Sequence, residues 1–234
     1  MKPSAAVLAA AVVVIPVTAA LIVTTHGGNH VPGTRTVAVT ASGVRTVDLQ
    51  AVPGQLTVVG SAAGGGRVTL TGELAWKGRP PRAASRLAAG HQLRLWYRCA
   101  AASPCSANWR LVVPRGTAVV LSQPAGHMIV SGLAGPLRIT AASVDVTAAG
   151  LRCGSLRAAI TSGHLGATFA VPPSQVSISL TSAQATLSLP GSVDYTVSDQ
   201  ITSGYVHVGI PERSGTTHTV TASVVSGELD LLTS

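Results

Sequence analysis

Six basic side chains lie close together in one stretch of this chain and could bind an anion. They are Lys77, Arg79, Arg82, Arg86, Arg94 and Arg98. Aromatic residues are interleaved with them, namely Trp76, Trp96, Tyr97 and Trp109. Guanidinium groups bind carboxylates and phosphates, and they also stack on aromatic rings. The combination indicates a surface for an anionic polymer or a carbohydrate.

Two other interpretations of the same stretch stay open. Nine of the 16 basic residues lie between Arg67 and Arg115, against the single acid Glu73, which is also what a solvated basic face would contain. The aromatic residues could instead form a cap over the open end of a repeat array. No helix-turn-helix, RRM or zinc-finger pattern accompanies the arginines, so we expect no nucleic-acid partner. A cell-wall polymer or an envelope protein is the expected partner.

The three cysteines predict one disulfide and one buried thiol. Cys99 and Cys105 are close in sequence, and Pro104 favours a turn between them. In an exported chain this spacing predicts a local disulfide. Cys153 is then left over, and its apolar neighbours predict that it is buried.

The remaining chemistry-bearing residues predict no catalytic, cofactor or metal site. Glycoside cleavage requires two nearby carboxylates, and beyond residue 140 only Glu228 and Asp230 share a strand face. They lie in the last repeat, where solvated charges are expected. His127 and His164 hold the same repeat position, but no carboxylate that would orient them is evident. A β-helix carbohydrate-active enzyme remains the alternative function.

A short phrase recurs along the chain, in which a small polar residue and a glycine precede alternating apolar and polar residues. Alternation at period two is typical of a β-strand, and glycine accepts the positive φ of a sharp corner. The predicted corner glycines are Gly54, Gly126, Gly163, Gly204 and Gly227. From residue 126 onward the phrase recurs about every 20 residues, a period typical of solenoids. Ala183 replaces the glycine in one copy, and residues 141–147 lack it.

An apolar segment precedes the repeats. Residues 5–23 carry no charge and are long enough to cross a bilayer as a helix. Lys2 precedes this segment and the next basic residue is Arg35, which places the N-terminus inside and the rest of the chain outside. A signal peptide cleaved near residues 17–19 is the competing interpretation. The predicted plan is a cytoplasmic end (1–4), a transmembrane signal anchor (5–23), a spacer (24–33) and a repeat domain (34–234). Residues 75–110 of that domain form the basic, disulfide-containing insertion.

These motifs, taken in order, resemble the DUF4097 family, whose members are described as β-strand-repeat or putative adhesin proteins. The resemblance covers about residues 31–234, and VPRGT at Val113–Thr117 followed by the repeats is its most specific part. It implies an all-β fold, a β-helix or β-solenoid-like domain on the outer side of the cytoplasmic membrane, of a kind common in actinobacteria. It implies an adhesin-like or structural role in the cell envelope and no catalysis. A regulatory component of the envelope that acts through a protein partner is a further alternative.

Overall fold

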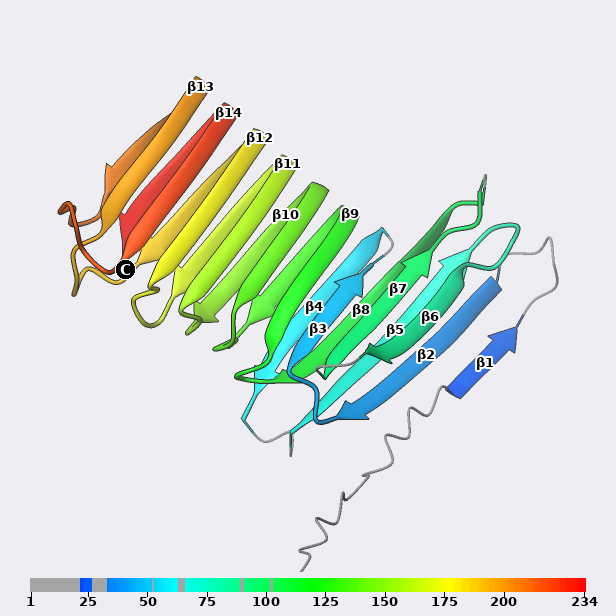
Figure 1. The fold of residues 1–234 in the computed structure, drawn as a ribbon. Coiled ribbons are helices and arrows are strands. Elements are labelled where there is room, and N and C mark those ends of the chain that lie inside the picture. Colours follow the sequence, from blue (N-terminus) through cyan, green and yellow to red (C-terminus); the bar gives the residue numbers. More distant parts are fainter. Residues whose placement is uncertain (1–21, 27–32, 52, 63–65, 89–90, 102) are drawn as a thin grey trace, which may run out of the picture.

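The chain is built of β-strands that join into one long sheet (Figure 1). The computed structural model describes residues 22–26, 33–51, 53–62, 66–88, 91–101 and 103–234, and within these ranges none lies in a helix. The all-β prediction is therefore confirmed. In chain order the strands are β1 (Ile22–His26), β2 (Gly33–Ser42), β3 (Thr46–Gln50), β4 (Gly54–Ser61), β5 (Arg67–Trp76), β6 (Arg82–Ala88), β7 (Gln92–Arg98), β8 (Cys105–Pro114), β9 (Ala118–Ser131), β10 (Leu137–Leu151), β11 (Ser155–Phe169), β12 (Gln175–Leu189), β13 (Thr196–Gly209) and β14 (Thr219–Thr233).

The C-terminal half is a stack of long parallel strands in register. β9, β10, β11 and β12 follow one another, so that Ala158 pairs with Ile139 on one side and with Ile178 on the other. The last two strands exchange places, because β14 pairs with both β12 and β13. The outermost strand is therefore β13, as Figure 1 shows.

In a long strand, the set of alternating residues that faces the core shifts by one residue at the predicted corner. In β11, Ile160 is buried, and the next buried side chain is Leu165, beyond an exposed segment that contains Gly163. Gly163 has a φ of 111°, which a side chain would disfavour. Because of this change, the two halves of one strand contribute to two walls around the same core.

The two walls continue into the N-terminal half through pairs of shorter strands. β3 pairs with the first half of β9 and β4 with its second half, so these two strands are equivalent to one long strand. β7 pairs with β3, and β8 pairs with β4, again in parallel. The stretch 75–110, predicted as an insertion, therefore supplies strands to both walls. Antiparallel strands complete this end, with β6 beyond β7 on one wall and β5, β2 and β1 beyond β8 on the other.

The N-terminal strand differs from the sequence prediction. Ile22 and Val23 were expected at the end of a membrane-spanning helix and Thr24–His26 in a spacer, but all five residues form β1. The strand pairs antiparallel with β2, where Val23 lies opposite Val37. Residues 1–21, which include nearly all of the predicted anchor, lie outside the described residues. In the described part of the chain, no helix is long and apolar enough to cross a membrane.

The core contains mostly small aliphatic side chains, in keeping with an aromatic content of only 3%. Tyr97 and Trp109 are exceptions at the N-terminal end, where their ring centroids are 4.1 Å apart. Both are buried, so these two aromatic residues of the basic stretch help to fill the core between the walls at this end.

Candidate functional site: the arginine face

The hairpin of β6 and β7 carries four exposed arginines on its outer surface. Arg82 lies directly opposite Arg98, and Arg86 lies directly opposite Arg94. The side chains of β7 that alternate with these, including Tyr97, are buried. Trp96 lies half-buried between Arg94 and Arg98. We call these four arginines, with Trp96, the arginine face.

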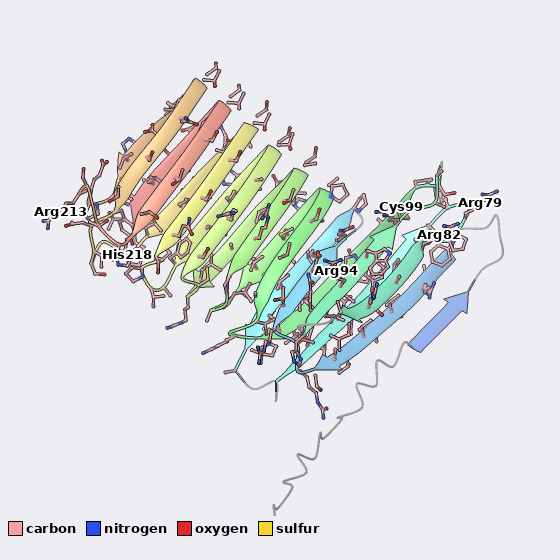
Figure 2. All side chains as sticks on the ribbon, in the orientation of Figure 1. Arg79, Arg82, Arg94, Cys99, Arg213 and His218 are labelled. Carbon is pink, nitrogen blue, oxygen red and sulfur yellow. A yellow bond between two sulfur atoms is a disulfide. The ribbon has the colours of Figure 1, made fainter. Side chains whose placement is uncertain are left out.

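Few negative charges balance this face. Asp48, on the adjacent strand β3, approaches Arg94 with a carboxylate-to-Nε distance of 3.8 Å. Within the described part of the chain, Arg82, Arg86 and Arg98 form no ion pair. A hollow of ≈ 270 Å³ lies between Asp48, Arg86, Arg94, Trp96 and their neighbours. By contrast, Arg213 near the opposite end of the molecule is paired with Asp194 at 3.0 Å (Figure 2).

A larger hollow adjoins the arginine face at the end of the hairpin. Its volume is ≈ 840 Å³, and we call it the end pocket. It is lined by Arg35, Arg79, Pro80, Pro81, Arg82, Arg98, Cys99, Ala100 and Ala101. Figure 2 shows Arg79, Arg82 and Cys99 together at this end, with Arg94 further along the sheet.

Arg35 is a member of this site that the sequence motifs did not predict. Arg35 is in phase with the buried residues Val37 and Val39 of β2, and this alternation was a signal that Arg35 faces inward. Its Nε is buried and has no hydrogen-bond partner among the described residues. Burial raises the pKa of the nearby Tyr97 to about 12, although the positive charge of Arg35 acts in the opposite direction.

Lys77 lies apart from the arginines with which it was grouped. It follows the end of β5, where its backbone N–H donates to the carbonyl of Pro104 at 3.1 Å. It lines a separate hollow with Trp76 and Cys105. The predicted binding set therefore divides into the arginine face, the end pocket and this isolated lysine.

The cysteines are arranged as predicted. Cys99 and Cys105 form a disulfide, with their Cα atoms 5.6 Å apart, which joins the end of β7 to the start of β8. Cys153 is a free, buried thiol. Burial raises the pKa of this thiol to about 11.

The five corner glycines all have a positive φ, between 111° at Gly163 and 154° at Gly227. Each lies at a corner of the stack and faces the backbone of a neighbouring strand. A Cβ atom added at Gly126, for example, would overlap the carbonyl oxygen of Gly54. In β10 this position is occupied by Val144, which pairs with Gly126. These glycines thus have a structural role in the stack.

Two carboxylates of the repeats contact a polar side chain of a neighbouring strand. Tyr205 of β13 donates a hydrogen bond to Glu228 of β14, and this bond raises the pKa of Tyr205. His127 lies beside Asp145 of β10, at 3.7 Å between Nδ1 and Oδ2, so it has a carboxylate neighbour that the sequence pattern did not predict. In the described ranges, no three His, Cys, Asp or Glu side chains are grouped so as to hold a metal ion.

Comparison with known proteins gives a likeness of fold. No family model matches the chain, and no curated protein matches it. One similar solved structure comes from Clostridium sporogenes and is described as that of "a putative cell adhesion protein". The similarity covers 86% of this chain and 100% of that one, with a TM-score of 0.51 and 10% sequence identity. At this identity the comparison concerns the fold alone.

Proposed function

We propose that this chain is a β-solenoid-like, adhesin-like protein of the DUF4097 type that binds an anionic polymer of the cell envelope and has no catalytic activity. The arginine face is the contact surface in this proposal. One observation carries this proposal: two pairs of arginines lie opposite each other across one exposed hairpin, beside the half-buried Trp96.

The like-charge pairs are the physical reason for this assignment. Like charges directly opposite one another on a sheet destabilise it, whereas opposite charges at the same positions stabilise it. Asp48 relieves this repulsion for Arg94 alone among the described arginines of the face. A polymer with repeated negative charges would supply the missing counterions along the length of β6 and β7.

The shape of the surface suits an extended ligand. The four arginines lie in two rows along the hairpin, and hollows lie beside them at both Arg94 and Arg98. Trp96 offers an apolar ring between the charges, which can lie against a sugar unit while the guanidinium groups bind its anionic substituents. The fold likeness to a protein described as a putative cell adhesion protein is consistent with this role.

The binding proposal is tested with purified full-length protein in a non-ionic detergent. Binding to purified envelope polymers would be measured at low and at high salt. We expect binding that weakens at high salt, because exposed charges are screened. The single variants Arg86→Gln and Arg94→Gln should each weaken it markedly, and the double variant should lose most of it. Arg110→Gln is the matched control, because Arg110 is exposed on β8, outside the arginine face.

Two results would contradict the proposal. Binding that is equally reduced by Arg110→Gln would show a diffuse charge effect rather than a site. The absence of polymer binding at low salt would favour the alternative, a component that acts through a protein partner.

The proposed location is the outer side of the cell membrane, with a single membrane anchor in the apolar segment that precedes β1. Protease treatment of intact cells provides the test. We expect the repeat domain to be digested in intact cells and the protein to fractionate with membranes. Protection of the whole chain until the cells are lysed would overturn this location.

A further inference from the structure

The end pocket collects four arginines from four separate segments of the chain. Arg35 comes from β2, Arg79 from the turn after β5, Arg82 from the start of β6 and Arg98 from the end of β7. The described residues that line the pocket include no acidic side chain. Segments distant in sequence therefore bring positive charges around one hollow of ≈ 840 Å³ without an internal counterion.

Arg35 distinguishes this pocket from a solvated basic surface. It occupies a position on β2 that alternation otherwise gives to buried valines, so it is directed toward the interior side of the sheet. Its Nε atom is buried and lacks an acceptor among the described residues. A buried charged donor without a partner is costly, and an anion in the pocket would supply the missing acceptor.

The walls of the pocket are held in place before any ligand arrives. The backbone N–H of Arg79 donates to the hydroxyl of Ser103 at 3.1 Å, which ties the turn after β5 to the loop after β7. The disulfide of Cys99 closes that loop. Pro80 and Pro81 restrict the backbone next to Arg79. A pocket held in this way loses little conformational freedom on binding.

We propose that the end pocket binds the phosphate group of a phosphate ester. Planar guanidinium groups match phosphate oxygens with pairs of N–H donors, and four of them suit a dianion better than a single carboxylate. The volume lies in the range of small-ligand sites and exceeds what one phosphate ion fills, which leaves room for an organic part beside Pro80, Pro81 and Ala100. This inference rests on the proposed function, since a phosphate-bearing envelope polymer would present such a group next to the arginine face.

Calorimetric titration of the full-length protein in a non-ionic detergent tests the pocket. The probes are glycerol phosphate and inorganic phosphate, each at constant ionic strength. We expect glycerol phosphate to bind more tightly than inorganic phosphate, because the apolar wall contacts only the ester. Arg35→Gln should weaken glycerol phosphate binding about tenfold or more, the value of a lost charge-assisted hydrogen bond. Arg35→Lys should recover part of that loss, and Arg110→Gln is the matched control for net charge.

Each outcome bears on the proposal. No binding of glycerol phosphate, tighter binding of inorganic phosphate, or an equal loss in Arg35→Gln and Arg110→Gln would overturn it. Thermal unfolding of each variant shows whether it is folded; if Arg35→Gln is not, the Arg79→Gln variant replaces it. Failure of the proposed function is distinguishable, because polymer binding then fails while glycerol phosphate still binds. Polymer binding that depends on Arg86 and Arg94, without glycerol phosphate binding, would instead overturn the pocket alone.

Discussion

Arg86 and Arg94 show at the scale of single residues how this surface differs from an ordinary solvated one. They lie opposite each other in a two-stranded hairpin, where an opposite-charge pair would stabilise the sheet. The positive charge of the hairpin surface therefore lowers the stability of the sheet. Such a loss is expected where the charge is needed for binding.

A charge reversal separates the effect of these arginines on stability from their effect on polymer binding. Arg86→Glu places an acid opposite Arg94, and we expect it to raise the free energy of unfolding by about 0.5–1 kcal/mol. The same change should weaken polymer binding. Urea unfolding and a binding assay measure the two quantities. Arg110→Glu is the control, because Arg110 lies opposite Thr71 and beside Thr57, so its stability should change by only a few tenths of a kcal/mol. Lower stability of Arg86→Glu would contradict the argument.

Tyr97 makes the stability of the N-terminal end depend on alkaline pH. Burial raises the pKa of its hydroxyl to about 12, whereas an unfolded chain has a tyrosine pKa of about 10. Above about pH 10 the unfolded state loses this proton while the folded state retains it, so unfolding becomes more favourable as pH rises. The stabilisation is complete below about pH 10 and is lost as the pH approaches the folded-state pKa.

We therefore expect the free energy of unfolding to fall between about pH 9 and pH 12, and to fall less in Tyr97→Phe. Urea unfolding across this range measures the slope. Cys153 and Tyr195, whose pKa values burial also raises, contribute to the remaining slope in the variant. An identical slope in the parent and in Tyr97→Phe would show that Tyr97 does not titrate with folding.

At the scale of the strand, the corner decides how a repeat is built. The glycine lets one strand turn, and its missing side chain lets the carbonyl of the next strand approach. Val144 shows that one strand of the stack accepts a side chain at this position, where it is buried. A side chain is therefore tolerated at this position where the backbone conformation accommodates it, as in β10. At a corner glycine with a positive φ, the backbone conformation disfavours a side chain.

Gly126→Ala tests this difference. The added Cβ would overlap the carbonyl of Gly54 at a φ of 116°, and we expect a loss of about 3 kcal/mol in the free energy of unfolding. Gly166→Ala is the matched control in the same stack, since the nearest atoms to its added Cβ are 3.9 Å and 4.0 Å away. Urea unfolding compares the two variants. A similar loss at Gly166 would show that any glycine of the stack is equally sensitive.

At the scale of the whole molecule, the two ends of the stack differ. The N-terminal end is completed by antiparallel strands, with Trp76, Tyr97 and Trp109 in its core. The other end terminates in β13, whose inward positions are partly open to solvent. Ile201 is 43% exposed, and Asp199 occupies another of these inward positions. An inward-pointing charge on an outermost strand discourages pairing with another chain.

The place of a strand in the stack should therefore decide how much stability is lost when its inward-facing isoleucine is replaced by alanine. Ile160 and Ile201 occupy equivalent repeat positions, but they are 2% and 43% exposed. We expect Ile160→Ala to lower the free energy of unfolding by about 2–5 kcal/mol. Ile201→Ala should lower it by about 1 kcal/mol or less, since its side chain is already largely hydrated. Chemical denaturation measures both, and equal losses would mean that β13 is covered in solution.

Local sequence patterns determined much of the architecture. Alternation at period two identified the β-strands, and the phrase after each corner glycine placed Gly54, Gly126, Gly163, Gly204 and Gly227 at residues with positive φ. The cysteine spacing identified the disulfide of Cys99 and Cys105, because a short loop with a turn brings its ends together. These features depend on residues that are close in sequence, so the sequence alone could reveal them.

Only the tertiary structure decided which distant segments meet. The order of β13 and β14 in the stack follows from how the final strands pair, and period-two alternation is the same in either order. The stretch 75–110 joins both walls through pairings with β3 and β4, which no local motif encodes. Arg35 reaches the end pocket because β2 pairs with β5 at the same end of the molecule. Alternation tells which side of a strand a residue faces, but the partners on that side depend on strand pairing across the whole chain.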